Sequence, residues 1–350
     1  MTVAPAAELS PPAAAGVVAR DAGSARNDFL DAVRMLAGLG VVWVHTFPAN
    51  DGPAAQHAGR FSVPFFTIIA VWLMARRPYP REPLVVALPT WGTFVRTRFQ
   101  RLYVPFLIWN VVYTIARMAK GTLGVTDLDV GWFFGGASTQ LWFLLFLLIV
   151  QCVVRGMQIA ASCGAFWRVA MIGSCAVGML PLFDQDFTIH TGRPSLDYFI
   201  QVSWHALPSA CIGTATALLG LHRWAVPPGL CLVCLGLTGA AIAAVMLHGR
   251  MYAVETLSGL TLALASISRF NGKAIRYLGA LGAYSLGIYL VHTGVLDAVR
   301  FAVDRPRIGT DIPSLVGVFV TTGVLSLLLC MLLVRLPYGD RLARWLSLKG

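Results

Sequence analysis

Long apolar stretches dominate this chain and restrict it to folds that can place such stretches away from water. Of its 350 residues, 57% are hydrophobic and only 12% are charged. A stretch of about 17 to 25 apolar residues has the length of a membrane-spanning helix. The sequence therefore predicts an all-α, polytopic integral membrane protein with about ten transmembrane helices. The predicted spans cover residues 29–48, 61–76, 102–119, 137–155, 165–183, 199–220, 228–247, 251–268, 275–297 and 312–336.

The two ends of the chain differ in composition from these apolar blocks. Residues 1–27 are rich in Ala and Pro and lack the compact apolar region of a cleavable signal peptide, so we expect a disordered cytoplasmic tail there. Residues 28–337 are expected to form one membrane domain, and residues 338–350 a cytoplasmic C-terminal tail. We expect neither an internal repeat nor an appended soluble domain.

The net charge of +11 is distributed unevenly along the chain. Most of the Lys and Arg residues lie in the two tails and in every second predicted loop, whereas the opposite loops are nearly neutral because they also carry Asp residues. By the positive-inside rule, this predicts a multi-pass protein of the inner (plasma) membrane with both termini in the cytoplasm. Membrane lipids are therefore expected partners, and nucleic acid is not.

Cysteine usage indicates neither a disulfide framework nor a metal site. The seven cysteines all lie in or beside predicted spans. Cys231 and Cys234 form a CxxC pair within GLCLVCLG, a setting more typical of helix packing than of metal binding or redox chemistry.

Ionisable residues inside the predicted spans are the main functional signal, because such groups are costly in a membrane and usually face the protein interior. Arg34 and His45 stand at the two ends of the run RMLAGLGVVWVH. Eleven helical steps place them on one face, about 16 Å apart. Asp31 precedes Arg34 by three residues and can pair with it. Two simpler interpretations are that Arg34 reaches lipid phosphates and that His45 bonds a neighbouring helix.

The chemistry of these groups favours a catalytic interpretation. A neutral imidazole can take a proton from a hydroxyl near neutral pH, and a guanidinium can hold a phosphate. The predicted loop at 76–101 contains six arginines, and Arg98 and Arg101 form an RxxR pair just before a span. This pair is either a phosphate site or only a signal for membrane orientation.

Two further stretches carry polar residues beside predicted spans. STQLWFLLFLL places Gln140 and Trp142 at the start of one span, and LGAYSLGIYLVH places Ser285, Tyr289 and His292 along one stripe of a helix. These side chains either line a cavity or form hydrogen bonds between helices.

Five stretches in the same order resemble the acyltransferase family 3 membrane proteins, whose bacterial members O-acylate cell-surface glycans. They are RNDFLDAVRMLAGLGVVWVH, FSVPFFTIIAVWLM, RTRFQRLYVPF, LWFL and LGAYSLGIYLVH, between about residues 26 and 336. The most specific element, an Arg followed by ten residues and a His, is matched by Arg34 and His45, and the RxxR by Arg98 and Arg101. Ala70 departs from the family pattern, since relatives commonly have Gly there.

The resemblance implies an O-acetyltransferase or other O-acyltransferase that uses cytoplasmic acyl-CoA, usually acetyl-CoA, as a donor substrate and holds no tightly bound cofactor. The expected acceptor is a hydroxyl of an exopolysaccharide, another surface glycan or a lipid-linked oligosaccharide, and polysaccharide biosynthesis proteins are possible partners. Alternatives are a lipid or small-molecule acyltransferase and a membrane transporter of glycan precursors.

The resemblance and the charge distribution together assign roles to the residues above. The CoA phosphates would bind Arg34, Arg98 and Arg101. His45 would activate the acceptor hydroxyl, or form an acyl-imidazole, while Asp31 orients Arg34. Candidates for the acceptor side are His205, Glu255, Tyr289 and His292. The expected outer loops add sugar-binding groups at Trp132, Gln140, Asp184, Asp186 and His190.

Overall fold

The fold is all-helical, as the sequence predicts. A computed structural model describes residues 27–47, 54–75, 84–124, 128–184, 186–219, 226–249, 251–268, 270, 272–303, 312–337 and 345–348, and no strand occurs among them. The α-helices are α1 (Asp28–Thr46), α2 (Ser62–Ala75), α3 (Leu84–Arg98), α4 (Val104–Ala119), α5 (Trp142–Cys163), α6 (Ala165–Val177), α7 (Pro194–Leu218), α8 (Pro228–His248), α9 (Tyr252–Ser266), α10 (Lys273–Gly282), α11 (Ser285–Ala302) and α12 (Ile312–Arg335). The shorter helical segments are η1 (Ala54–Gly59), η2 (Phe99–Tyr103), η4 (Val130–Phe133) and η5 (Leu180–Leu182).

Fewer helices qualify as membrane spans than the ten we predict. In the described part of the chain, seven helical runs are long and apolar enough, or eight if the bent pair α10 and α11 counts as one span. The prediction of about ten is therefore wrong. The seven runs are Asp28–Thr46, Ala55–Ala75, Pro89–Ala119, Trp142–Cys163, Ala165–Leu182, Pro228–His248 and Pro313–Arg335.

The difference arises where polar residues enter the helix bundle. The predicted span at 275–297 is broken into α10 and α11, which meet at an angle of 65°. The predicted span at 251–268 corresponds to α9, which has only 15 residues and buries polar side chains such as Glu255 and Thr261. Helix α7 likewise buries His205 and Ser209. Such helices face other protein helices, so their hydropathy is lower than that of a helix facing lipid.

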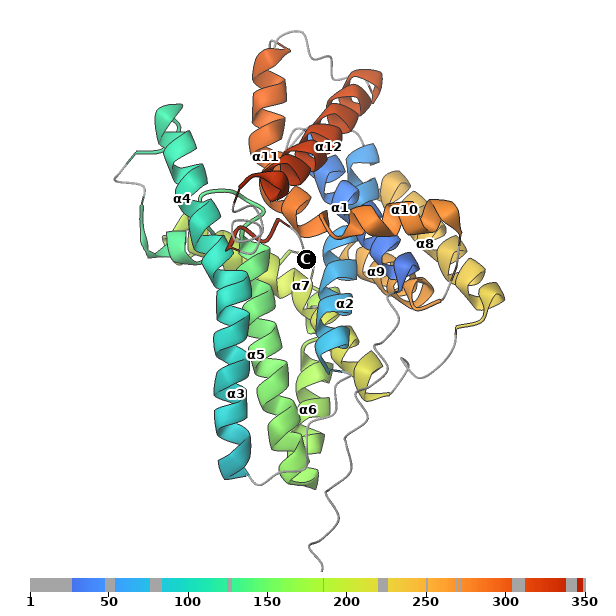
Figure 1. Cartoon of the computed structure of the whole chain (residues 1–350). Coiled ribbons are helices and arrows are strands. Elements are labelled where there is room, and N and C mark those ends of the chain that lie inside the picture. The colour runs from blue at the N-terminus through green and yellow to red at the C-terminus, as the bar shows by residue number, and fades with distance from the viewer. Residues whose placement is uncertain are drawn as a thin grey trace, which may run out of the picture.

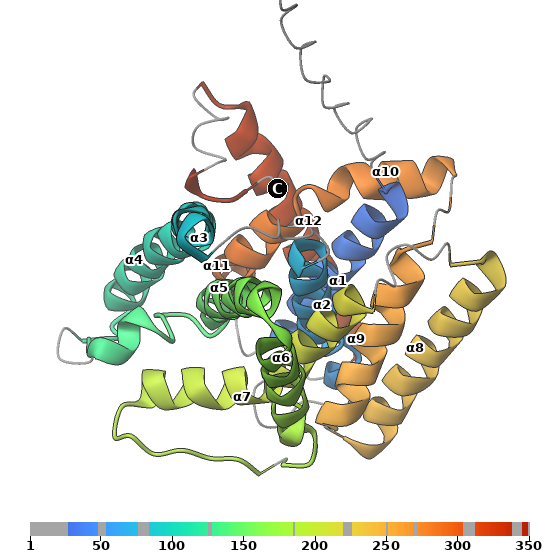
Figure 2. The ribbon, with the colours of Figure 1, turned by 90° about the horizontal axis from the view of Figure 1, so that it is seen from below.

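Helix α1 lies at the centre of one half of the molecule. It packs against α10, α11, α12 and α2 (Figures 1 and 2). Its start is capped by Asn27, whose side-chain oxygen accepts hydrogen bonds of 3.1 Å from the backbone N–H groups of Phe29 and Leu30. The other half is built on α2, which packs along α7, and on the buried stretch of α5.

The arginine-rich segment that we predict to be a loop is largely helical. Helix α3 continues through the π-helical turn η2 into α4, so helical structure runs from Leu84 to Ala119. Arg98 and Arg101 therefore lie in the middle of a helical run, and α3 extends beside α5 (Figure 1). Arg96 lies in α3 as well, whereas residues 76–83, with Arg76, Arg77 and Arg81, lie outside the described residues.

Part of the C-terminal segment is packed into the protein. Leu348 is fully buried in a cluster with Met35 and Ile288. The indole N–H of Trp109 donates to the carbonyl of Leu346 at 3.2 Å, and the Ser347 hydroxyl donates to the carbonyl of Arg101 at 3.3 Å. The remaining residues of the expected tails, 1–26, 338–344 and 349–350, lie outside the described residues.

The CxxC pair serves packing, which agrees with the interpretation of the sequence. Cys231 and Cys234 are buried where α8 meets α9, and the Cys231 thiol lies 3.6 Å from the carbonyl oxygen of Ala265.

Candidate functional site

The ion pair predicted near the start of α1 is present. Nη1 of Arg34 lies 3.1 Å from Oδ1 of Asp31, and both side chains are partly exposed. Helix α10 approaches this turn so closely that a Cβ at Gly282 would collide with the carbonyl oxygen of Asp31. The close contact explains why this helix crossing requires a residue without a side chain. The ion pair with Asp31 thus keeps the Arg34 guanidinium near the N-terminal end of α1.

At the opposite end of α1, His45 lies beside a second histidine. The ring centroids of His45 and His292 are 5.1 Å apart, and His292 comes from α11. Nδ1 of His292 lies 2.7 Å from the carbonyl oxygen of Tyr289, so this nitrogen carries the proton. Nε2 is buried with no hydrogen-bond partner among the described residues. The lone pair on Nε2 of His292 is therefore unused, next to the ring of His45.

Two arginines surround the end of α1 that carries His45. Nη2 of Arg300 donates to the carbonyl of Thr46 at 2.8 Å and to that of His45 at 3.3 Å. These bonds satisfy carbonyl groups that the helix end would otherwise leave unpaired. Arg60 donates from Nε to Nδ1 of His57 at 2.9 Å and lies 3.9 Å from Oε1 of Glu255. Both guanidinium groups lie within electrostatic range of the His45 imidazole.

A close backbone contact brings Arg60 to this position. A Cβ at Gly59 would overlap the carbonyl oxygen of Gly40 and lie 2.9 Å from a methyl carbon of Val44. The indole N–H of Trp43 also donates to the carbonyl of Ala55 at 2.8 Å. The segment η1 is therefore held against α1. We call His45, His57, Arg60, Glu255, His292 and Arg300 the His45 cluster.

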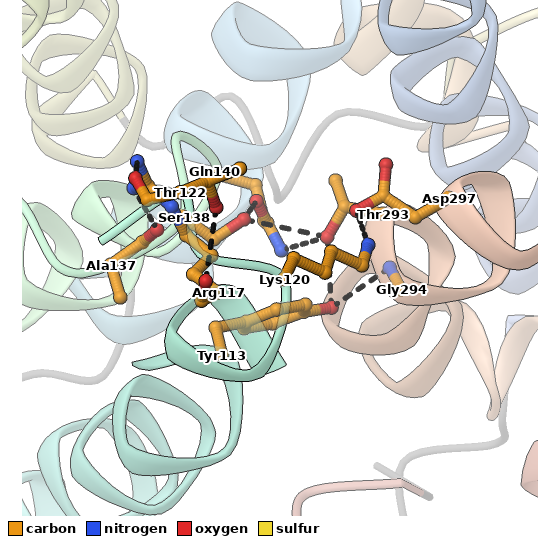
Figure 3. Close-up of polar contacts among 10 residues, drawn as sticks. All are labelled: Tyr113, Arg117, Lys120, Thr122, Ala137, Ser138, Gln140, Thr293, Gly294 and Asp297. Carbon is orange, nitrogen blue, oxygen red and sulfur yellow. Dashed lines mark hydrogen bonds and ion pairs between the residues drawn. The ribbon is translucent and has the colours of Figure 1, made fainter. Parts of the chain in front are cut away.

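The segment before α5 is tied to the same helix that carries His292. The Tyr289 hydroxyl donates to the carbonyl of Gln140, and Nε2 of Gln140 donates to the Thr293 hydroxyl at 2.6 Å. Thr293 in turn donates to the Tyr113 hydroxyl at 2.8 Å, as Figure 3 shows. Tyr113 completes the chain by donating to the carbonyl of Leu290 at 2.6 Å. The polar groups of Gln140 and Tyr289 are thus occupied in fixing the position of α11.

The remaining acceptor-side candidates occupy different surroundings. The ring of His205 on α7 stacks on Tyr252 of α9, with centroids 3.7 Å apart and planes inclined by 8°. Glu255 follows Tyr252 by one helical turn and is buried beside Arg60. Trp132 donates from its indole nitrogen to the Thr114 hydroxyl at 2.8 Å. Asp186 and His190 are exposed, and Asp184 is half-buried. The structure thus places His292 beside His45 and Glu255 beside Arg60, whereas His205 stacks on Tyr252.

The two arginines of the RxxR pair lie on a helix surface. The guanidinium carbon of Arg98 is 5.1 Å from the ring centroid of Phe94, and Arg155 of α5 lies over the same ring at 5.9 Å. Arg101 is exposed. Arg98, Arg101 and Arg155 therefore supply positive charge on α3, η2 and α5, whereas Arg34 lies on α1.

Sequence reasoning did not single out Arg60, Arg300 or Thr293. Both arginines stand at the edges of apolar stretches in the sequence, where loop charges are expected. Among the described residues, no group of three or more His, Cys, Asp or Glu side chains is arranged to hold a metal ion.

Several helices are long and apolar enough to span a membrane, as in a multi-pass membrane protein. Within the bundle, His45 lies beside the buried His292. A family model described as an acyltransferase domain, that of acyltransferase family 3, matches residues 27–335. The match covers nearly the whole chain, and the chain therefore belongs to this family, which makes it a membrane acyltransferase. No curated protein and no solved structure gives a significant match.

Proposed function

We propose that this acyltransferase moves an acyl group, acetyl in the first instance, from cytoplasmic acyl-CoA to a hydroxyl of an exopolysaccharide or another surface glycan. The observation that carries this proposal is the arrangement along α1. Its start bears the Asp31–Arg34 ion pair, and its end bears His45 beside His292. A phosphate-binding group and a base about 16 Å apart suit a long anionic thioester such as acyl-CoA.

In the proposed reaction, His45 acts as a general base. It removes the proton from the acceptor hydroxyl as the oxygen attacks the thioester carbonyl. The resulting tetrahedral oxyanion collapses, the carbon–sulfur bond breaks, and the CoA thiolate takes the proton from the His45 imidazolium. Arg60 and Arg300 would stabilise the oxyanion through their positive charge. The products are the glycan ester and free CoA.

The donor would enter from the cytoplasmic side. Arg34, Arg98 and Arg101 would bind the phosphates of CoA, and Asp31 would orient Arg34. The support for this part is the basic character of the predicted cytoplasmic loops together with the partial exposure of Arg34 and the exposure of Arg101. The acceptor would approach from the other face, near Glu255 and His292. Tyr289 would fix the position of α11 there through its hydrogen bond to the carbonyl of Gln140.

The experiment that tests the proposal uses sealed vesicles that contain the protein in one known orientation. Radiolabelled acetyl-CoA is supplied on the face that carries the chain termini, and a glycan is enclosed on the opposite face. Labelled glycan ester inside the vesicles is the expected product. Transfer only when both substrates share one face would contradict the transmembrane scheme, and transfer to lipid alone would favour a lipid acyltransferase.

A further inference from the structure

A cavity beside the His45 cluster has no role in the scheme above. It has a volume of about 550 Å³ and lies between the end of α4, the segment before α5 and the start of α7. This volume falls within the range of about 300–1,000 Å³ that is typical of small-molecule sites. Its wall includes Arg117, Leu123, Asp129, Ser138 and Tyr198.

The lining combines apolar side chains with neutral hydrogen-bonding groups. Besides Asp129 and Arg117, the wall presents hydroxyl side chains, backbone groups of a glycine pair and one tyrosine. Nη1 of Arg117 donates to the carbonyl of Ala137 at 2.9 Å, and Nη2 to that of Thr122 at 3.4 Å (Figure 3). Its charge is therefore already engaged with carbonyl oxygens. One engaged cation and one carboxylate do not favour a phosphate-bearing ligand.

Asp129 supplies the carboxylate of the cavity wall. Its Oδ1 atom is buried and has no hydrogen-bond partner among the described residues. Protein atoms beside Gly131 cover this oxygen, so a ligand in the cavity would reach the carboxylate through Oδ2, which is not buried in this way. Asp129 immediately precedes η4, but its side chain does not cap that helix. The carboxylate is thus free of any capping role that would explain its position.

The cavity is connected to the catalytic histidines by a short series of contacts. Ser138 lines the cavity, and its hydroxyl donates to Oε1 of Gln140 at 2.5 Å. The carbonyl of Gln140 accepts the Tyr289 hydroxyl, and the ring centroid of Tyr289 lies 6.1 Å from that of His292. The cavity is therefore near the His45 cluster but does not contain it.

We propose that this cavity binds a neutral saccharide unit of the acceptor, next to the unit whose hydroxyl is acylated. The inference rests on the proposed function, because it assigns the acceptor to a glycan of at least two sugar units. Asp129 would accept a hydrogen bond from a sugar hydroxyl through Oδ2, and the hydroxyl groups of the wall would bind others. Holding this unit would position the next hydroxyl for His45.

The test measures binding without any acyl donor. Purified protein in lipid nanodiscs is applied to an array of neutral di- to tetrasaccharides, and the dissociation constants of the bound sugars are then measured in solution. We expect saturable binding by the wild type and by His45→Ala. Asp129→Asn should weaken binding by about tenfold or more, because it removes the charged acceptor. Leu123→Trp should abolish binding by filling the cavity.

The matched control is Asp297→Asn. It makes the same chemical change in an exposed ion pair with Lys120 outside the cavity wall, and should bind like the wild type. If Asp129→Asn does not fold, Leu123→Trp decides the result, since Leu123 lies in a short connection after α4.

The proposal is overturned if no sugar of the array binds saturably, or if both cavity variants bind like the wild type. Binding that depends on the cavity, in a protein that transfers no acyl group, would refute the proposed reaction and leave this site standing. Acyl transfer that neither cavity variant changes would refute this site and leave the proposed reaction standing.

Discussion

The His45 cluster and the RxxR segment both carry ionisable residues, but they are built differently. The cluster draws side chains from α1, α9, α11 and the residues around η1, and His292 and Glu255 within it are buried. Arg98 and Arg101 come from one continuous helical run, and Arg101 is exposed. Groups converging from distant segments can act together on one atom, whereas charges on one exposed helix can only attract a ligand. We therefore expect chemistry at the first region and donor binding at the second.

The largest effect is expected from His45→Ala. We expect acyl transfer to fall by about 10²- to 10⁴-fold, because the proposed general base is lost. Transfer of labelled acetyl groups by purified, correctly folded protein measures the effect. His248→Ala removes an exposed histidine from the end of α8 and should keep full activity. Equal activity of the two variants would remove His45 from the mechanism.

The role of positive charge in the cluster is tested by Arg60→Gln. We expect kcat to fall by about 10²-fold with a smaller change in KM for the donor, because the charge acts on the oxyanion and not on bound substrate. Steady-state kinetics with varied acyl-CoA separates the two constants. Arg276→Gln makes the same change at an exposed position of α10. A pure increase in KM would instead make Arg60 a donor-binding residue.

The donor-binding role of the second region is tested by Arg98→Ala and Arg101→Ala. Each should raise the dissociation constant for a non-hydrolysable acyl-CoA analogue by about tenfold, since a charge-assisted hydrogen bond to phosphate is lost. Calorimetric titration of the detergent-solubilised protein measures this. Arg96→Ala, an exposed change on the same helix, is the control. Unchanged affinity together with altered membrane insertion would show that the RxxR arginines determine topology alone.

The smallest effect is expected from Asp31→Asn. The Asp31–Arg34 pair is partly exposed, and such pairs contribute about 0.2–1 kcal/mol. We expect KM for acyl-CoA to rise by only about two- to fivefold, because Arg34 loses its fixed orientation but keeps its charge. A loss comparable to that of His45→Ala would mean that Asp31 takes part in the reaction itself. Kinetics at two salt concentrations would show whether the change is electrostatic.

Local sequence determined the helices and the pairs within them. Apolar block length predicts the helical membrane fold, and helical spacing predicts both the Asp31–Arg34 ion pair and the common helix of Ser285, Tyr289 and His292. Each of these features depends on residues a few positions apart, for which the rise and rotation of a helix are known in advance.

Tertiary structure alone decided how these helices meet. The contacts of His45 with His292 and of Arg60 with Glu255 join segments that are far apart in the chain. The close approach of Gly59 to Gly40 makes the Arg60 contact possible. The apolar blocks of the sequence also gave α7 and α9 the same interpretation as the other predicted spans, although polar residues of both helices are buried in the protein. Composition reports how apolar a segment is, whereas packing determines which neighbour each of its faces contacts.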